Sequence, residues 1–303
     1  MKPAQGRTVT DTSDFMAIEP GDVILVGGRR YLVRGEEREY RFGVEDPKFW
    51  VKKVIDVQTQ ERKLIKLAYA ETFMTQLGGV QVRCFRNSAK ESAILDLVAG
   101  HPSFMQGTNF TDDRGNPVRV LEIVRGVNFL NYIDSFKMPH EVYFWTVLPD
   151  ILRNLIGAIQ AIGFLHAHGF RHGDIRNDHV IVTHGSGKYV WIDFDYDFDL
   201  PENPFGLDVF GLGNLIIYAI GKGFHEYYMI RNDRYVYQDL AERVTMEDFS
   251  ILHTSRLVNL RKYYPYIPPF LNNVLLHFSK GAPLFYENTQ ELVEDLQGFL
   301  TSV

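Results

Sequence analysis

The stretch Gly163–Phe198, GFLHAHGFRHGDIRNDHVIVTHGSGKYVWIDFDYDF, guides the interpretation of the whole 303-residue chain. The apolar periodicity that leads into it predicts a helix ending near Gly169. Two short β-branched and aromatic segments around a glycine-rich turn then predict a β-hairpin. Asp174 precedes this hairpin, Asp193 follows it, and Arg176 lies between them in sequence. Two carboxylates at the ends of rigid elements suit a metal-phosphate with a nucleophile beside it.

At these residues the chain resembles a known family. HGDIRNDH followed by IDFD is similar to the catalytic loop (H-x-D-x-x-x-x-N) and the metal-binding D-F-G of the protein kinase superfamily. The resemblance implies ATP and Mg²⁺ as cofactors, Asp174 as the base that accepts a hydroxyl proton, and Asp193 as a metal ligand. Arg176 falls where the family usually has a lysine that neutralises the transferring phosphoryl group, which makes it the second catalytic candidate.

The metal site departs from the family pattern at His179. This residue stands where the family has the asparagine that holds a metal, and neutral imidazole suits Mn²⁺ better than Mg²⁺. Three alternatives follow: the preference shifts to Mn²⁺, Asn177 or Asp178 takes over, or one metal is lost. A histidine without any ligand role is the competing interpretation. Asp195 replaces the glycine of D-F-G, and a metal role is open for it as well.

A strand lysine and a helix glutamate extend the resemblance towards the N-terminus. Lys66, in a strand predicted over 63–67, matches the lysine that binds the α- and β-phosphates. A helix predicted over 88–100 carries Glu91, which matches the glutamate that pairs with this lysine. Glu91 three residues after Ser88 also fits a capping box, and a capping carboxylate cannot also reach Lys66. We expect the ion pair between Lys66 and Glu91.

Further cofactor contacts come from the resemblance alone. It implies a hinge at Glu122 and Val124, whose backbone groups would face an adenine edge, and it assigns Ile181 to the nucleotide site. Gly43 would belong to the loop that covers the phosphates, but residues 44–48 of this loop include two acids and a proline. Proline lacks an N–H donor and carboxylates repel phosphate, so this loop is expected to bind ATP weakly.

The segment after Asp193 is unusually short. Asp208, fifteen positions later, opens an apolar run that resembles the buried helix anchoring the family's large lobe and catalytic loop. The intervening activation segment and peptide platform are therefore nearly absent. Gly173 replaces the arginine that would bind a phosphorylated activation loop, in agreement with this loss. The resemblance extends from about Glu39 to Leu300 and is closer to atypical bacterial protein-kinase-like domains than to antibiotic kinases.

The predicted fold is α+β and two-lobed, like a protein kinase. It has a small lobe with an antiparallel sheet and one helix, and a mainly helical large lobe. We expect a flexible N-terminal tail over residues 1–20 and a small lobe over 21–124, with an extra hairpin around Gly27-Gly28. The large lobe over 125–303 would carry the catalytic loop.

Composition sets the remaining bounds. A 45% hydrophobic fraction allows an ample core, and a net charge of −6 gives no reason to expect nucleic acid or an anionic membrane as partner. A single cysteine, Cys84, excludes an internal disulfide. The N-terminal residues are polar and no segment predicts a membrane span, so we expect a soluble cytoplasmic protein.

Two functions are compatible with the sequence. The first is an ATP-dependent phosphotransferase that transfers the γ-phosphoryl group to a hydroxyl of a protein or small-molecule acceptor. The alternative is a pseudokinase, a nucleotide-sensing or partner-binding module without transfer. Retention of Lys66, Asp174, Arg176 and Asp193 favours the enzyme, whereas the altered phosphate loop and His179 favour the pseudokinase.

Overall fold

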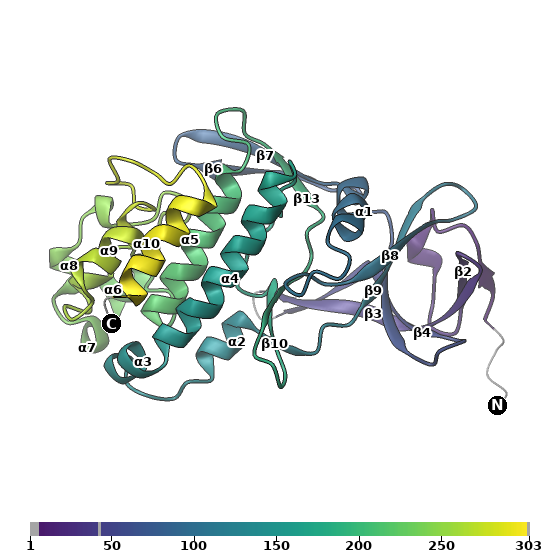
Figure 1. The fold of residues 1–303 in the computed structure, drawn as a ribbon, viewed down its shortest axis with the longest axis horizontal. Coiled ribbons are helices and arrows are strands. Elements are labelled where there is room, and N and C mark those ends of the chain that lie inside the picture. Colours follow the sequence, from purple (N-terminus) through teal and green to yellow (C-terminus); the bar gives the residue numbers. More distant parts are fainter. Residues whose placement is uncertain (1–5, 42–43, 302–303) are drawn as a thin grey trace. The chain divides into compact units, whose positions relative to one another are not determined.

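A computed structural model describes residues 6–41 and 44–301 of the chain. The chain forms two compact units (Figure 1). The first unit consists of Met1–Glu71 and Arg86–Arg125, and the second of Thr72–Phe85 and Gly126–Val303. The change of unit after Arg125 lies one residue from the expected boundary. The return of residues 72–85 to the second unit was not expected from the sequence. Gly43 lies outside the described residues.

A seven-stranded sheet forms most of the first unit, in the order β1-β2-β3-β4-β5-β9-β8. Its neighbouring strands are antiparallel, apart from the parallel pair β1 and β2. One α-helix, α1 (Ser88–Leu97), accompanies the sheet. The strands are β1 Thr8–Val9, β2 Val23–Val26, β3 Arg29–Arg41, β4 Val44–Asp56, β5 Arg62–Lys66, β8 Gly107–Thr111 and β9 Pro117–Glu122. The expected extra hairpin is confirmed as β2 and β3.

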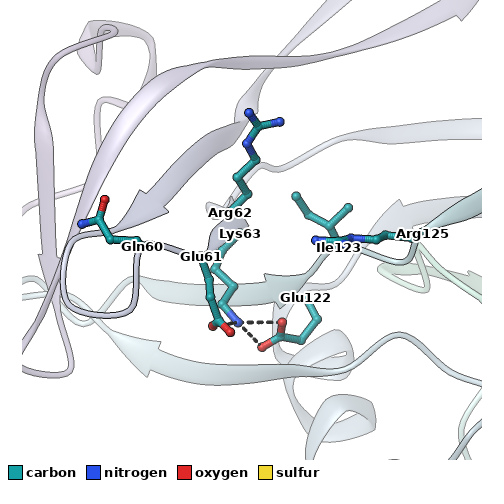
Figure 2. Close-up of a pocket in the computed structure, with 7 residues that line it drawn as sticks. All are labelled: Gln60, Glu61, Arg62, Lys63, Glu122, Ile123 and Arg125. Carbon is teal, nitrogen blue, oxygen red and sulfur yellow. Dashed lines mark hydrogen bonds and ion pairs between the residues drawn. The ribbon is translucent and has the colours of Figure 1, made fainter.

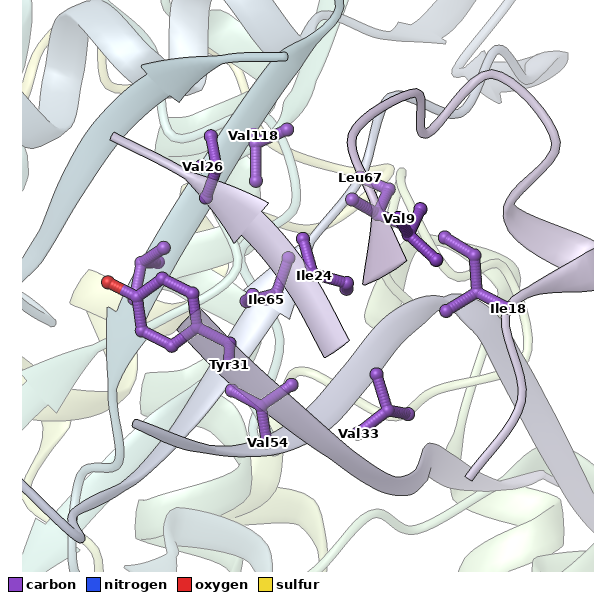
Figure 3. Close-up of a cluster of buried hydrophobic side chains, with 11 residues drawn as sticks. Val9, Ile18, Ile24, Val26, Tyr31, Val33, Val54, Ile65, Leu67 and Val118 are labelled. Carbon is purple, nitrogen blue, oxygen red and sulfur yellow. The ribbon is translucent and has the colours of Figure 1, made fainter. Parts of the chain in front are cut away.

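Buried aliphatic side chains and Tyr31 fill one face of this sheet (Figure 3). Side chains alternate along a strand, so Ile65 of β5 lies in this core while Leu64 and Lys66 belong to the opposite face. Val9 and Ile18 are also buried in this core. The prediction of a flexible tail over 1–20 is therefore wrong for residues 8–18, because they contribute a strand and apolar side chains to the sheet.

In the second unit, a β-hairpin and a strand from elsewhere in the chain form a small sheet. Strands β6 (Thr72–Leu77) and β7 (Val80–Arg86) form the hairpin, and β13 (Tyr196–Asp199) completes the order β13-β7-β6. Cys84 of β7 is buried beside Phe198 of β13. Burial raises the pKa of the Cys84 thiol to about 11, so this cysteine is unreactive at neutral pH.

Helix α4 (Leu148–Ala167) is the central helix of the second unit and contacts α3, α5 and α10 (Figure 1). The other helices are α2 Phe129–Asp134, α3 His140–Thr146, α5 Gly206–Gly221, α6 Tyr227–Asn232, α7 Arg234–Tyr237, α8 Leu240–Arg243, α9 Pro269–Leu276 and α10 Thr289–Leu300. Three further strands pair antiparallel: β10 Gly126–Asn128, β11 Val180–Thr183 and β12 Tyr189–Trp191. The last two form the hairpin expected after the catalytic-type loop.

Among the described residues, α4 is the one helix long and apolar enough to cross a membrane. Within its most apolar 18-residue window, 61% is buried inside the protein, as in a core helix of a globular domain. Trp191 donates from its indole nitrogen to the Ala158 carbonyl of α4 at 2.9 Å, which ties the helix to β12. The architecture is of the α+β class, with an antiparallel-rich sheet and a helical unit.

Candidate functional site

A buried carboxylate on α5 holds the loop that carries the candidate catalytic residues. Asp208 accepts the backbone N–H groups of His172 at 2.7 Å and Gly173 at 2.8 Å. His166 contacts the same carboxylate at 3.0 Å. Burial opposes ionisation of Asp208, but the hydrogen bond from His166 and the bonds from the loop lower its pKa.

Two glycines let the loop lie tightly against α5. Gly173 has a φ of +86°, a conformation that a residue with a side chain rarely adopts. This geometry gives a local reason for glycine beside His172. On α5, a Cβ added to Gly211 would lie 2.7 Å from the Cβ of Ile175. Two carbon atoms that are not bonded to each other do not come this close. The loop therefore packs closely against the helix at a point where only glycine fits.

His179 lies between two candidate catalytic carboxylates. Its Nδ1 is 2.8 Å from the backbone oxygen of Asp174 and 3.5 Å from the Oδ2 of that residue. Its Nε2 is 3.6 Å from the Oδ2 of Asp193. Asp193 has a φ of +63°, a strained conformation of the kind found at functional sites. The loop that carries Asp174 and the residue Asp193, which follows the β11–β12 hairpin, thus lie close together, as the sequence predicted.

The tautomer of His179 follows from its contacts. A carbonyl oxygen only accepts, so Nδ1 carries a proton towards Asp174, and Nε2 faces Asp193. The imidazole nitrogen and the carboxylate oxygen lie 3.6 Å apart, and both are atom types that bind divalent cations. No group of three or more such ligands occurs among the described residues.

Arg176 is fixed beside Asp174 by a second aspartate. Its Nε donates to Asp178 Oδ1 at 2.9 Å and its Nη2 to Asp178 Oδ2 at 2.5 Å, a bidentate pair. Its Nη1 is 3.9 Å from Asp174 Oδ2. Asp178 therefore faces the arginine, and His179 is the residue that faces Asp193. We call Asp174, Arg176, His179 and Asp193 the Asp174 group.

The pKa of Asp174 is raised above the usual value of a carboxyl group. Burial is the largest cause, and the positive charges of His179 and Arg176 oppose it. The side chain is nevertheless 22% exposed, so a substrate can reach it. A carboxylate with a raised pKa is a better proton acceptor than one with an ordinary pKa.

Three buried charged side chains form the second cluster, in the first unit. Lys66 Nζ donates to Glu91 Oε1 at 3.0 Å, so the expected ion pair is present. Arg119 of β9 donates from Nε to Glu91 Oε2 at 3.1 Å and from Nη2 to the Leu67 carbonyl at 3.0 Å. The cap of α1 is Asn87, which excludes the capping-box alternative for Glu91. We call Lys66, Glu91 and Arg119 the Glu91 triad.

Sequence analysis missed Arg119. It lies on β9, and the register that pairs Lys66 with Arg119 brings the two cations together on one face of the sheet. This pairing joins strands more than fifty residues apart in the chain. No local pattern reports such a register, although an arginine in an otherwise apolar strand was a signal that it needs a buried partner.

The predicted hinge residues lie beside two cavities of the first unit. Glu122 lines a cavity of about 640 Å³ and binds Lys63 Nζ through both carboxylate oxygens, at 2.5 and 2.6 Å (Figure 2). Its backbone N–H donates to the Gln106 carbonyl at 2.8 Å, so the Glu122 carbonyl is the backbone group that would serve the expected contact with an adenine. A neighbouring cavity of about 480 Å³ is lined by Leu64 and Ile123.

The other predicted cofactor residues are distributed between the two units. Val124 follows β9 in the first unit, and Ile181 lies on β11 in the second, where it pairs with Val190 of β12. A metal role was also open for Asp195. This residue lies two positions after Asp193, and it is buried.

Comparisons with known proteins add no family to this picture. No protein-family model matches the chain, and no curated protein matches its sequence. The functional argument therefore depends on the two charged clusters and the cavities.

Proposed function

We propose that the protein is an ATP-dependent phosphotransferase with a protein-kinase-like fold. The observation that carries the proposal is the position of His179 between Asp174 and Asp193, with Arg176 held beside Asp174. Four polar groups from a loop and a strand end lie close together, although the fold does not require polar side chains at these positions. The sequence resemblance supplies the reaction, transfer of the γ-phosphoryl group to a hydroxyl.

The residues present fit a divalent cation. Asp193 and His179 would hold it with one oxygen and one nitrogen, a mixed set that favours Mn²⁺ while allowing Mg²⁺. A bound ion would neutralise negative charge on the phosphates of ATP. With two protein ligands, phosphate oxygens and water would complete the coordination.

Asp174 and Arg176 would act on the acceptor. The carboxylate of Asp174 accepts the proton of the attacking hydroxyl, a contribution of about 10² to 10⁴ in rate. Arg176, oriented by its two bonds to Asp178, places a positive charge where negative charge develops on the transferring group. Positioning and electrostatics supply most of the catalysis in this reaction class.

The first unit would bind the nucleotide. Lys66 is held rigidly by Glu91, and Glu91 by Arg119, so the ammonium group is preorganised for phosphate oxygens. The cavity beside Leu64 and Ile123 would take the adenine, because apolar side chains form part of its walls.

The alternative is a pseudokinase that binds nucleotide without transferring phosphate. Two sequence features favour it: the acids and the proline that follow Gly43, and His179 in place of the family's metal-binding asparagine. A pseudokinase would bind the same nucleotide but would not transfer its phosphate. Binding and turnover must therefore be measured separately.

A thermal-shift titration tests nucleotide binding. ATP with Mn²⁺ at about 100 times its Kd should raise the Tm by about 5 °C, and Mg²⁺ should give a smaller rise. Lys66→Met should abolish most of the shift, whereas Lys188→Met, an exposed lysine of the second unit, should keep it. A Tm that ATP and either metal leave unchanged would rule out both nucleotide functions.

A further inference from the structure

A groove on the second unit lies away from the Asp174 group. It has a volume of about 540 Å³ and is formed by the turn Gly78-Gly79 of the β6–β7 hairpin, the loop after β13 and the segment 283–287. Leu200 and Phe210 lie on its apolar walls. We call it the Leu284 groove. It belongs wholly to the second unit.

Hydrogen bonds between the walls keep the groove open in a fixed shape. The Gly78 N–H donates to the Ile251 carbonyl at 3.4 Å, which anchors the hairpin turn. Asn203 Nδ2 donates to the Glu287 carbonyl at 2.9 Å and joins the other two walls. Phe210 and Phe285 pack edge to face with centroids 5.4 Å apart. A preformed groove binds a ligand without paying for its own ordering.

Large apolar side chains are exposed around the groove. Val80 is 43% exposed, Leu284 72% and Phe285 40%. Single exposed apolar residues are common, but three around one concave surface form a continuous patch of the kind that marks a binding site. Covering these side chains would remove apolar surface from water and provide the main gain in free energy.

Negative charge lies along the same surface. A second cavity of about 390 Å³ shares residues 284–287 with the groove and adds further acids. The carboxylates that line the two cavities are Glu202, Glu287, Glu291, Glu294 and Asp295. Neither lysine nor arginine lines either cavity within the part of the chain that the structure describes, and His277 is the one basic side chain there.

We propose that the Leu284 groove and its acidic margin bind a peptide segment of a partner protein that presents apolar or aromatic side chains next to lysine or arginine. The apolar side chains fill the groove, and the cations face the carboxylates. Nucleic acid and anionic membranes are disfavoured, because the acids would repel their phosphates. The continuity of two cavities suits an extended chain better than a compact small molecule. The inference does not require phosphate transfer, since a pseudokinase would bind the same segment.

Peptide binding can be measured directly, without nucleotide. The probes are three fluorescent twelve-residue peptides: one with a central Leu-Phe pair followed by three lysines, one with glutamates in place of the lysines, and one with alanines in place of Leu-Phe. Fluorescence anisotropy at low salt should show binding of the first peptide alone. Its affinity should fall as salt is raised, because the charged part of the interaction is screened.

Variants of exposed residues place the binding site. Leu284→Ser should weaken binding of the first peptide about 10-fold by removing apolar contact. The double variant Glu202→Lys and Glu287→Lys, whose side chains have no hydrogen bond to maintain, should weaken it about 10-fold at low salt and less at high salt. Val142→Ser and Glu141→Lys on α3 are matched exposed controls and should bind as the unmodified protein does.

The outcomes are decisive for the groove and separate from those for phosphate transfer. Loss of binding in both groove variants, with unchanged Tm and unaffected controls, supports the proposal. No binding of the first peptide, equal binding of all three peptides, or equal binding by groove variants and unmodified protein would overturn it. Failure of nucleotide binding would leave this result untouched.

Discussion

The Glu91 triad and the Asp174 group differ in what holds them in place. In the triad, Lys66 and Arg119 come from paired strands and Glu91 from a helix, and all three side chains are buried. In the Asp174 group, the side chains stand on irregular backbone, and all but the buried His179 are partly exposed. One carboxylate, Asp208, fixes the loop. One cluster is fixed by sheet register, the other by a few hydrogen bonds.

This difference fits a division of work between binding and chemistry. A buried ion network is rigid and suits a fixed contact to phosphate, whereas groups that accept protons and metals must be reached by the acceptor. Removing one member should therefore have different consequences in the two clusters. A change in the Glu91 triad should destabilise the sheet. A change in the contacts that hold the Asp174 group should free the loop.

The largest expected effect is on the loop. Asp208→Ala removes the acceptor of two buried backbone N–H groups and the partner of His166, so we expect a loss of about 4 kcal/mol in the free energy of unfolding. Urea denaturation followed by tryptophan fluorescence measures it. Asp150→Ala, an exposed acid on α4, is the matched control. A loss below about 1 kcal/mol would show that Asp208 does not hold the loop.

The triad should respond next. Arg119→Met keeps the volume but leaves Glu91 with one cation fewer, and we expect a loss of about 3 kcal/mol. Glu91→Gln in the same chain should recover part of it, because the glutamine carries no charge to compensate. Arg62→Met, a cation of the same sheet, should cost less than about 0.5 kcal/mol. Additive effects of the two triad changes would contradict the direct coupling.

The smallest expected effect is on the pH dependence of stability. Burial lowers the pKa of His140, His225 and His253, all in the second unit, to about 4. The unfolded chain binds protons on these rings below about pH 6.5, and the folded chain does so only near pH 4, so stability falls as pH drops through this window. The loss should be about 1 kcal/mol per histidine between about pH 7 and pH 5 after allowance for solvent screening.

Asp208 does not obscure this pH test. The pKa of Asp208 is lowered, so its contribution to stability is lost only below the carboxyl range near pH 4. Urea titrations at several pH values give the free energy of unfolding as a function of pH. This free energy should depend less steeply on pH in His225→Gln than in the unmodified protein. An equal pH dependence in the two proteins would show that folding does not lower the pKa of His225.

The sequence predicted the Asp174 group well because its residues lie within twenty positions of one another. HGDIRNDH and IDFD lie on either side of a hairpin, and local turn chemistry specifies where both ends of that hairpin lie. The strand, the helix and the ion pair of Lys66 and Glu91 were also predicted. Backbone strain at Asp193 and the tight approach of Gly211 to Ile175 have no sequence signature of their own.

Long-range pairing explains what the sequence could not show. The β6–β7 hairpin pairs with β13, more than one hundred residues later, and so joins the second unit. Arg119 meets Glu91 through the register of β5 and β9, and Val9 and Ile18 join a core assembled from distant strands. These contacts depend on which strands become neighbours, and side-chain periodicity along one segment does not encode that choice.

Transfer of a labelled γ-phosphate tests the central claim most directly. The unmodified protein, Asp174→Asn and the exposed control Asp199→Asn would be incubated with ATP labelled at the γ-phosphate, with Mn²⁺ or Mg²⁺ and a panel of protein and small-molecule acceptors. We expect transfer by the unmodified protein and the control, and a rate lower by about 10² to 10⁴ for Asp174→Asn. Transfer that continues at the unmodified rate in Asp174→Asn would contradict the account.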